Sequence, residues 1–395
     1  VILEPGDTAY YDSATPHGMI AVGGQDCLFY AIVLNPSGEP VPELTPSRAL
    51  PDAAPRMAEP ETARRIYHQY IDVDKDENGT PTAIRFHDVE HFNFGFDVVD
   101  AIAAREPDRL AMLHLDREKR ERRFSFADMR DLSNRCANYF RALGVRRGDR
   151  VMLVLKRHWQ FWPVMLALHK IGAIPIPATN MLVEKDFEYR FKATDTRAVI
   201  CTVDGETAHH AERGAADAGL SDMIKISVGG KLDGWRDFGE EFGAFSDEFE
   251  RRPGVGGNET MFMLFTSGTT GYPKVASHAY TYALAHYVTA RYWHNIDPNG
   301  LHLTISDTGW GKALWGKFYG QWLCEGAVFA YDFDRFHADD ILPLFKKYNI
   351  TTFCAPPTMY RFFIKEDLSK YDLSSLKYTT IAGEALNPEV YYKWL

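Results

Sequence analysis

The sequence contains few cysteines, no long apolar run and no excess of positive charge, and each shortage excludes a class of protein. Its five cysteines are scattered with no Cys-x-x-Cys pair, which excludes a disulfide framework and is typical of reduced thiols in the cytoplasm. The longest apolar stretch, residues 161–178, is interrupted by His169, Lys170 and three prolines, so no membrane span is predicted. A formal net charge of −10 argues against a nucleic-acid partner, which would require a basic face.

The N-terminal part has a different character from the rest of the 395 residues, a length that already favours more than one domain. Residues 1–34 alternate strand-like runs with turn clusters, and residues 4–18 resemble the second motif of the cupin β-barrels. His17 occupies the position of the histidine in that motif and is either a metal ligand or a structural residue. No metal site is predicted, because the further ligands would precede residue 1. Half a barrel cannot close its own core, so this segment is expected to be the end of a cupin-like domain. The proline-rich residues 35–60 predict an extended linker.

Residues 61–395 are predicted to form one α/β domain. Residues 64–76 favour a first helix, and Ser125–Asp128 has the shape of a capping box that starts a helix ending near Leu143. The expected strands are residues 150–155, 173–176, 198–202, 301–305, 327–331 and 351–354, and the further helices are residues 161–171, 186–193, 207–218, 314–323 and 338–348. This alternation predicts layered βαβ units, with parallel sheets covered by helices on both faces.

The stretch 266–274 is built to hold phosphates. It follows an apolar run, Met261–Phe265, that reads as a buried strand. Glycines let backbone amides approach a ligand closely, and consecutive exposed amides suit an anion. The predicted nucleotide-binding residues are Thr266, Ser267, Gly268, Thr269, Thr270, Gly271, Tyr272, Pro273 and Lys274. A helix is expected to start again at Ser277 and His278.

The same stretch identifies a family resemblance. It is not a Walker A loop, because two residues separate Gly271 from Lys274, and the alternative to a phosphate site is a flexible surface turn. Thr-Ser-Gly-Thr-Thr-Gly-Tyr-Pro-Lys resembles the signature loop of the adenylate-forming enzymes, which include the acyl-CoA synthetases. Residues 137–151 and 173–180 also resemble the N-terminal lobe of acyl-CoA synthetases. The resemblance implies that Asn180 lies towards a CoA channel, and a plain loop asparagine is the alternative.

Two further motifs support the resemblance. Asp307, Thr308, Gly309 and Trp310 follow a predicted strand and resemble the motif that lines the acyl pocket of acetyl- and medium-chain acyl-CoA synthetases. The alternative for Trp310 is simple packing between the sheet and the next helix. The second motif is Gly383, Glu384 and Ala385, which resembles the adenine-binding turn of the family. The sequence up to Leu395 lacks three later family elements, among them a Mg²⁺-binding glutamate and the domain with the adenylation lysine. The chain is therefore expected to be a fragment truncated at both ends, and this fragment is expected to be weakly active or inactive.

The resemblance implies an acyl-CoA synthetase that uses ATP, Mg²⁺ and CoA. A small-molecule carboxylic acid would react with ATP to give acyl-AMP and pyrophosphate, and the CoA thiol would then displace AMP. Thr266 and Lys274 are the expected catalytic residues, because they would compensate phosphate charge. Two alternatives stay open. The thiol could belong to a carrier protein, or the cupin-like part could belong to a ligand-sensing transcription regulator whose DNA-binding part precedes residue 1.

Overall fold

The structure is a computed structural model that describes residues 64–266 and 272–395. The predicted cupin-like segment with His17, the linker and residues 267–271 lie outside the described residues, so the division at residues 34 and 60 stays a prediction. Most described residues belong to one unit, Ala54–Leu264 with Ala276–Leu395. Phe265–Val275 is grouped separately and is treated by itself below. Within the described ranges, no helix has the length and apolar character needed to cross a bilayer.

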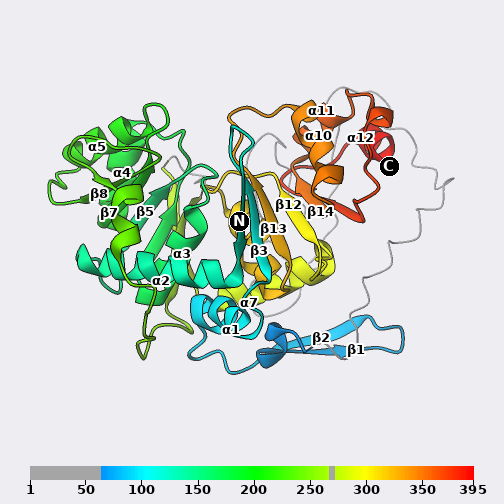
Figure 1. Ribbon diagram of the computed structural model, residues 1–395, viewed down its shortest axis with the longest axis horizontal. Helices are drawn as coiled ribbons and strands as arrows, with labels where there is room; N and C mark the ends of the chain where they lie inside the picture. The colour runs from blue at the N-terminus through cyan, green and yellow to red at the C-terminus, as the bar shows by residue number, and fades with distance from the viewer. Residues whose placement is uncertain (1–63, 267–271) are drawn as a thin grey trace, which may run out of the picture. The chain divides into compact units, whose positions relative to one another are not determined.

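Two sheets form the framework of the main unit (Figure 1). The six-stranded sheet has the order β15-β14-β12-β13-β3-β4, and its strands run parallel except for the β3–β4 pair. Its strands are β3 (Leu110–Leu115), β4 (Glu121–Ser125), β12 (Leu301–Thr304), β13 (Ala327–Tyr331), β14 (Ile350–Ala355) and β15 (Tyr378–Ile381).

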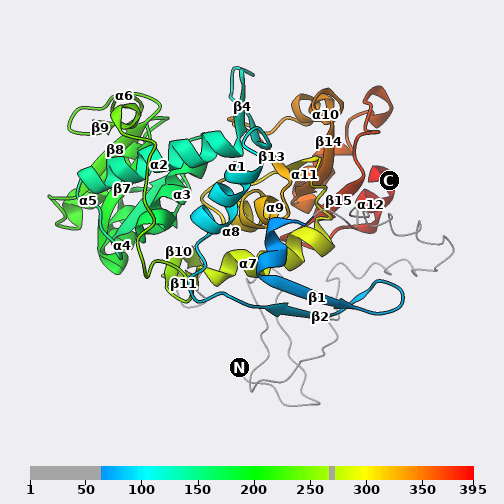
Figure 2. The same cartoon turned by 60° about the horizontal axis from the view of Figure 1, so that its bottom comes forward.

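The second sheet is five-stranded, parallel and ordered β6-β5-β7-β8-β9. Its strands are β5 (Arg150–Val154), β6 (Ile174–Pro177), β7 (Thr196–Thr202), β8 (Ile224–Val228) and β9 (Arg236–Asp237). Two hairpins complete the strands: β1 (Ile71–Lys75) with β2 (Pro81–Phe86), and β10 (Thr260–Thr266) with β11 (Lys274–Ala279), both visible in Figure 2.

Helices cover both sheets, as the layered prediction requires. The α-helices are α1 (Ala101–Arg105), α2 (Phe126–Ala142), α3 (Phe161–Ile171), α4 (Glu184–Thr194), α5 (Thr207–Asp217), α6 (Phe238–Glu241), α7 (Thr281–Val288), α8 (Gly311–Gly316), α9 (Tyr319–Leu323), α10 (Ala338–Lys347), α11 (Pro357–Phe363) and α12 (Pro388–Trp394). Short 3₁₀ segments are Ile66–Gln69, Phe242–Ala244 and Leu368–Lys370, and π-helical turns are Gly95–Asp100 and Thr289–Trp293.

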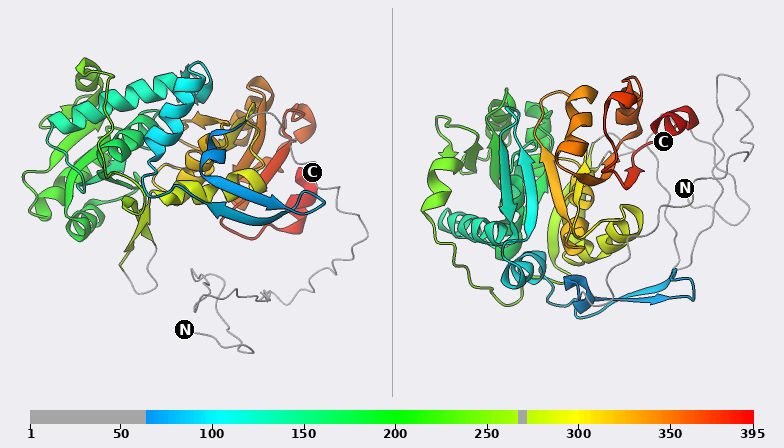
Figure 3. Two further views of the ribbon diagram at one scale, coloured as in Figure 1. Left: turned by 90° about the horizontal axis from the view of Figure 1, so that it is seen from below. Right: turned by 45° about the vertical axis from the view of Figure 1, so that its right-hand side comes forward.

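Strand β13 shows how the layers are packed. Its side chains alternate, so Val328 and Ala330 join the core shared with α2, α3, α7 and α9. Ala327, Phe329 and Tyr331 join a second core with α10, α11 and α12 on the other face. Figures 1 and 3 show the same arrangement, with α10–α12 on the side of the six-stranded sheet that is turned away from the five-stranded one. Parallel strands buried on both faces are the expected consequence.

Three predicted elements are wrong. Residues 64–76 form a 3₁₀ turn and strand β1 instead of a helix, because Ile71 and Val73 alternate with exposed aspartates and pair across a hairpin with β2. Ser277 and His278 belong to strand β11, and α7 starts only at Thr281. The helix predicted for residues 314–323 is broken into α8 and α9 at Lys317 and Phe318.

Candidate functional site

Two of the predicted site segments lie at the same edge of the six-stranded sheet. Strands β12, β14 and β15 are parallel neighbours, so their carboxyl ends meet at one edge. Strand β12 leads into Asp307–Trp310, and β15 leads into Gly383–Ala385. Ligands of α/β proteins bind outside the carboxyl ends of such strands. This edge is therefore the candidate functional site.

Lys312 connects these two segments directly. It lies in α8, two residues after Trp310, and its Nζ donates a hydrogen bond of 2.5 Å to the carbonyl oxygen of Ala382. Burial lowers the pKa of Lys312, against opposing effects of Cys354 and Glu384. No pattern in the sequence indicates this contact, because the partner is a backbone carbonyl 70 residues away.

The turn at residues 383–385 presents an exposed backbone. Gly383 has a φ of 115°, a conformation that side chains with a Cβ rarely adopt, which explains glycine at this position. The carboxylate of Glu384 accepts a hydrogen bond of 2.7 Å from the Thr358 hydroxyl and lies 3.5 Å from Arg361 Nη2. These contacts hold Glu384 against α11, and residues 383–385 are exposed to solvent.

The loop Asp307–Trp310 is docked tightly against the ends of β5 and β6. Asp307 accepts a 2.9 Å hydrogen bond from its own loop, at the N–H of Gly309, and its other carboxylate oxygen lies 3.4 Å from Arg157 Nη1. The buried Thr308 hydroxyl donates to the carbonyl oxygen of Lys156. A Cβ on Gly309 would lie only 2.3 Å from backbone atoms of Ala178 and Thr179. These three residues therefore fix the loop, and the side chains of Asp307 and Thr308 are engaged in protein contacts.

Trp310 is the exposed member of this loop. Its side chain is 58% exposed, so the alternative that it packs into the core between sheet and helix is wrong. Asn180 lies two residues beyond Ala178, in the segment that Gly309 contacts, and is half-buried. The Asn180 carbonyl accepts a hydrogen bond of 3.3 Å from the Thr207 hydroxyl. The structure thus brings the segments of Asn180 and Trp310 together, and the ligands of both residues stay predictions.

A lysine that sequence reasoning missed lies beneath the loop. Lys317 is 2% exposed, and its Nζ donates a hydrogen bond of 2.5 Å to the carbonyl oxygen of Ser306. Burial, together with the nearby Arg157, lowers the pKa of Lys317 to about 7, against the opposing effects of Asp307 and Asp332. The buried cation and the loop are therefore coupled through Ser306 and Asp307.

The predicted phosphate-binding stretch is described only at its two ends. Thr266 ends β10 and Lys274 begins β11, and the Thr266 hydroxyl donates to the Lys274 carbonyl at 3.4 Å. Lys274 is exposed, and Tyr272 is 72% exposed. The intervening Ser267, Gly268, Thr269, Thr270 and Gly271 lie outside the described residues, so their roles stay predictions.

Comparison with known proteins places the chain in a family. The family model described as AMP-binding enzyme matches residues 99–395. The chain belongs to the AMP-binding enzyme family. This confirms the resemblance to adenylate-forming enzymes that was carried by the Thr266–Lys274 stretch and the two later motifs.

Relatives of this AMP-binding chain are acyl-CoA synthetases. It is 33% identical over 312 residues to the mitochondrial acyl-coenzyme A synthetase ACSM3 of Homo sapiens, covering 77% of this chain and 53% of that protein. The mitochondrial acyl-coenzyme A synthetase ACSM4 of Homo sapiens is 33% identical over 313 residues, with the same two coverages. The chain thus spans about half the length of these relatives.

Solved structures confirm the layered α/β fold. The crystal structure of Brucella canis acyl-CoA synthetase matches with a TM-score of 0.65 at 24% identity, over 76% of this chain and 54% of that one. The anthranilate CoA ligase AuaEII, in complex with anthranoyl-AMP, matches with a TM-score of 0.68 at 21% identity, over 77% and 57% of the two chains. At these identities the likeness establishes the fold alone.

Proposed function

We propose that this chain carries the nucleotide- and acyl-binding part of an AMP-forming acid–CoA ligase. The observation that carries the proposal is the Lys312 bridge, which holds the predicted adenine turn beside the loop that presents Trp310. A carboxylate must be aligned with the α-phosphorus of ATP for adenylation, so adjacent nucleotide and acyl segments are what this reaction requires.

The reaction has two balanced steps. A carboxylate oxygen forms a bond to the α-phosphorus of ATP while the bond from that phosphorus to the pyrophosphate oxygen breaks, which gives acyl-AMP and pyrophosphate. The sulfur of CoA then bonds to the acyl carbon, the acyl–phosphate C–O bond breaks, and AMP and the thiol proton leave. Both reactants of the first step are anions, so positive charge at the phosphates must offset their repulsion.

Individual roles follow from the motifs within this proposal. Lys274 and the hydroxyls and amides of residues 266–271 would bind the phosphates of ATP, as the composition of that stretch favours. Gly383–Ala385 would flank adenine, Trp310 would border the acyl group, and Asn180 would face the approach of CoA. The exposure of Trp310 and of residues 383–385 supports these assignments.

Mg²⁺ would reach the site on the phosphate oxygens of ATP and would neutralise part of their charge. Residues 64–266 and 272–395 contain no group of three His, Cys, Asp or Glu side chains suited to hold a metal ion by themselves. Within this proposal, the charge compensation assigned to this chain comes from Lys274 and the loop amides.

The names of the two human relatives, both acyl-coenzyme A synthetases, support coenzyme A as the acceptor thiol. The alternative acceptor is the phosphopantetheine thiol of a carrier protein. Thioester formation assayed with each thiol in turn distinguishes the two, because only the true acceptor will release AMP from preformed acyl-AMP.

A cytoplasmic location is part of the proposal. Four cysteines, Cys136, Cys201, Cys324 and Cys354, are buried free thiols, which suits a reducing compartment. The two human relatives are named as mitochondrial proteins.

The proposal is tested by the exchange of radiolabelled pyrophosphate into ATP in the protein that carries this sequence. We expect exchange only when a carboxylic acid is added, and a panel of acetate, medium-chain and aromatic acids identifies the substrate. Replacement of Lys274 by alanine should reduce exchange by about a hundred-fold, because it removes a cation from the phosphate site. Lys185→Ala, a matched loss of an exposed lysine, should leave the rate unchanged. Undiminished exchange in Lys274→Ala would refute the phosphate-binding role.

A further inference from the structure

A large cavity lies apart from the candidate functional site and shares none of its residues. Its volume is about 990 Å³, and it lies between the C-terminal half of α2, the turn that follows and the segment between Phe245 and Val255. Ligand cavities in proteins typically occupy about 300–1,000 Å³. Four arginines and one glutamate line it: Arg141, Arg146, Arg147, Arg252 and Glu248. In a protein with a net charge of −10, such a concentration of positive charge requires an explanation.

Two of these arginines are engaged by the protein itself. Arg147 donates a hydrogen bond of 2.7 Å to the Gly254 carbonyl and forms an ion pair with Glu259. Arg146 donates to the carbonyl oxygens of Arg141 and Val145 at 3.0 and 3.3 Å, which satisfies the C-terminal end of α2. Neither of these side chains therefore needs a ligand.

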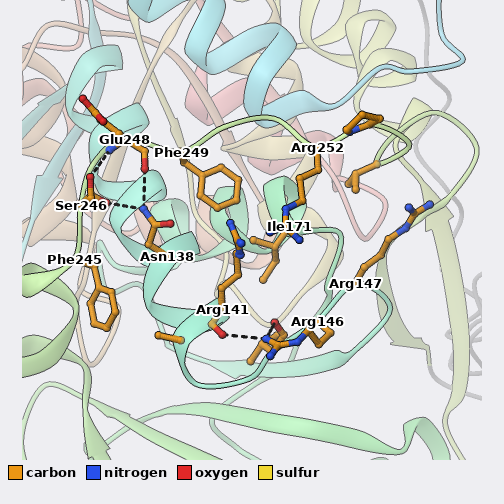
Figure 4. Close-up of a pocket in the computed structure, with 14 residues that line it drawn as sticks. Asn138, Arg141, Arg146, Arg147, Ile171, Phe245, Ser246, Glu248, Phe249 and Arg252 are labelled. Atoms are coloured by element: carbon orange, nitrogen blue, oxygen red, sulfur yellow. Dashed lines mark hydrogen bonds between the residues drawn. The ribbon is translucent and has the colours of Figure 1, made fainter.

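Arg141 and Arg252 differ from the other two. Among the residues that the structure describes, neither guanidinium has a carboxylate within 4.0 Å. Figure 4 shows Arg141 and Arg252 extending toward each other from opposite sides of the cavity, while Arg147 extends away. Two like charges that face each other repel, and an anion between them turns this repulsion into attraction.

The cavity also offers an apolar surface beside these charges. The Phe249 ring lies 5.5 Å from the Arg141 guanidinium carbon and lines the cavity together with Val145, Ile171 and Val255. A guanidinium binds phosphate oxygens through paired N–H donors, and an aromatic ring packs against a planar or aliphatic group. The two surfaces together fit a molecule with a phosphate at one end and an apolar group at the other.

We propose that this cavity binds a phosphate-bearing amphiphile, with the phosphate between Arg141 and Arg252 and the apolar part against Phe249. The ligand chemistry is that of a phosphate ester, and it has two possible sources: an aromatic ester of the nucleotide kind or an alkyl ester of the lipid kind. Binding here is independent of the adenylation reaction, because the cavity shares no residue with that site.

The test is calorimetric titration of the protein with phenyl phosphate, octyl phosphate and inorganic phosphate. At least one ester should bind about ten-fold or more tightly than inorganic phosphate, owing to the apolar contact. Arg252→Gln and Arg141→Gln should each weaken that binding by about ten-fold or more, since each removes a charged hydrogen-bond donor. The ester that binds more tightly identifies the source of the natural ligand.

Matched variants keep the test decisive. Arg123→Gln removes an equal charge from an exposed position in β4 and should leave the affinity unchanged. Lys274→Ala should also leave it unchanged, which separates this site from the proposed phosphate stretch. Arg252 is exposed and lies outside the helices and strands, so its variant probes the charge even if Arg141→Gln disturbs folding. Unaltered affinity in Arg252→Gln overturns the proposal, as does equal binding of the esters and inorganic phosphate.

Discussion

Lys317 is enclosed beneath the Asp307–Trp310 loop, although burial of an ammonium group is costly unless a partner offsets it. Its Nζ reaches the Ser306 carbonyl, and its pKa falls to about 7, against the ordinary 10.5. Folding therefore weakens proton binding at this residue. Below pH 10.5 the unfolded chain binds a proton at Lys317 more tightly than the folded protein does. This difference lowers the free energy of unfolding in that pH range.

The first prediction concerns pH. The penalty from Lys317 is constant below pH 7 and falls as the pH rises from about 7 toward 10.5, by at most about 1.4 kcal/mol per pH unit. Replacement of Lys317 by methionine removes this penalty. The free energy of unfolding of the wild type, relative to that of Lys317→Met, should therefore rise between about pH 7 and pH 10.5. Urea unfolding of both proteins at several pH values measures the difference. The exposed Lys185→Met should show no such trend, and a pH-independent difference for Lys317→Met would contradict the prediction.

Motif residues of the candidate site could be predicted from the sequence, whereas the residues that hold them could not. Asp307–Trp310 follows the strand predicted at residues 301–305, whereas Gly383–Ala385 was singled out by the family resemblance alone. Strand β15 before that turn, and the meeting of the two segments at one sheet edge, were not predicted. Lys312 and Lys317 act on backbone carbonyls, at Ala382 and Ser306, and backbone acceptors leave no pattern in a sequence. Only the three-dimensional arrangement reveals them.

At the scale of elements, most predicted helices and strands were found, and the errors lie where a hairpin or a tertiary contact replaces a helix. Helix α2 begins at the predicted capping box, where the Ser125 side chain accepts from the Asp128 N–H. The predicted helix at 314–323 is interrupted after Gly316, whose carbonyl oxygen accepts a hydrogen bond of 2.6 Å from the Thr304 hydroxyl of β12. Tertiary contact of this kind overrides local helix propensity.

The docking of the Asp307–Trp310 loop gives a prediction at this scale. A methyl group on Gly309 would overlap the backbone of Ala178 and Thr179, so Gly309→Ala must displace the loop and Trp310 with it. Pyrophosphate exchange should fall by about ten- to a hundred-fold, since small misplacements of positioning groups have large kinetic effects. The free energy of unfolding should fall by about 1–3 kcal/mol.

Gly311→Ala is the matched control for this loop. The nearest atom to its added methyl is Leu264 Cδ1 at 3.4 Å, an ordinary contact, so activity should be retained. Comparable loss of exchange in both variants would show that the docking against β6 does not position Trp310.

At the scale of the main unit, a buried lysine ties the two sheets together. Lys156 follows β5 of the five-stranded sheet, and its Nζ lies 2.9 Å from both Asp204, after β7, and Asp334, after β13 of the other sheet. Burial lowers the pKa of Lys156, but hydrogen bonds to Asp204 and Asp334 outweigh it and raise the pKa above its ordinary value. Asn180 follows a strand of one sheet and Trp310 a strand of the other, so this cation links the two parts of the framework that carry these predicted site residues.

The last prediction follows from that geometry. Lys156→Met leaves Asp204 and Asp334 facing each other without their shared cation, and Arg117 compensates only partly because it lies 2.7 Å from Asp204 but 3.8 Å from Asp334. The free energy of unfolding in urea should fall by about 1–3 kcal/mol, the cost of leaving partly buried charges unpaired. Lys119→Met removes an exposed ion pair with Asp340 and should change it by less than about 1 kcal/mol. Equal effects of the two substitutions would mean that Lys156 contributes no more than a surface pair, and that packing alone joins the sheets.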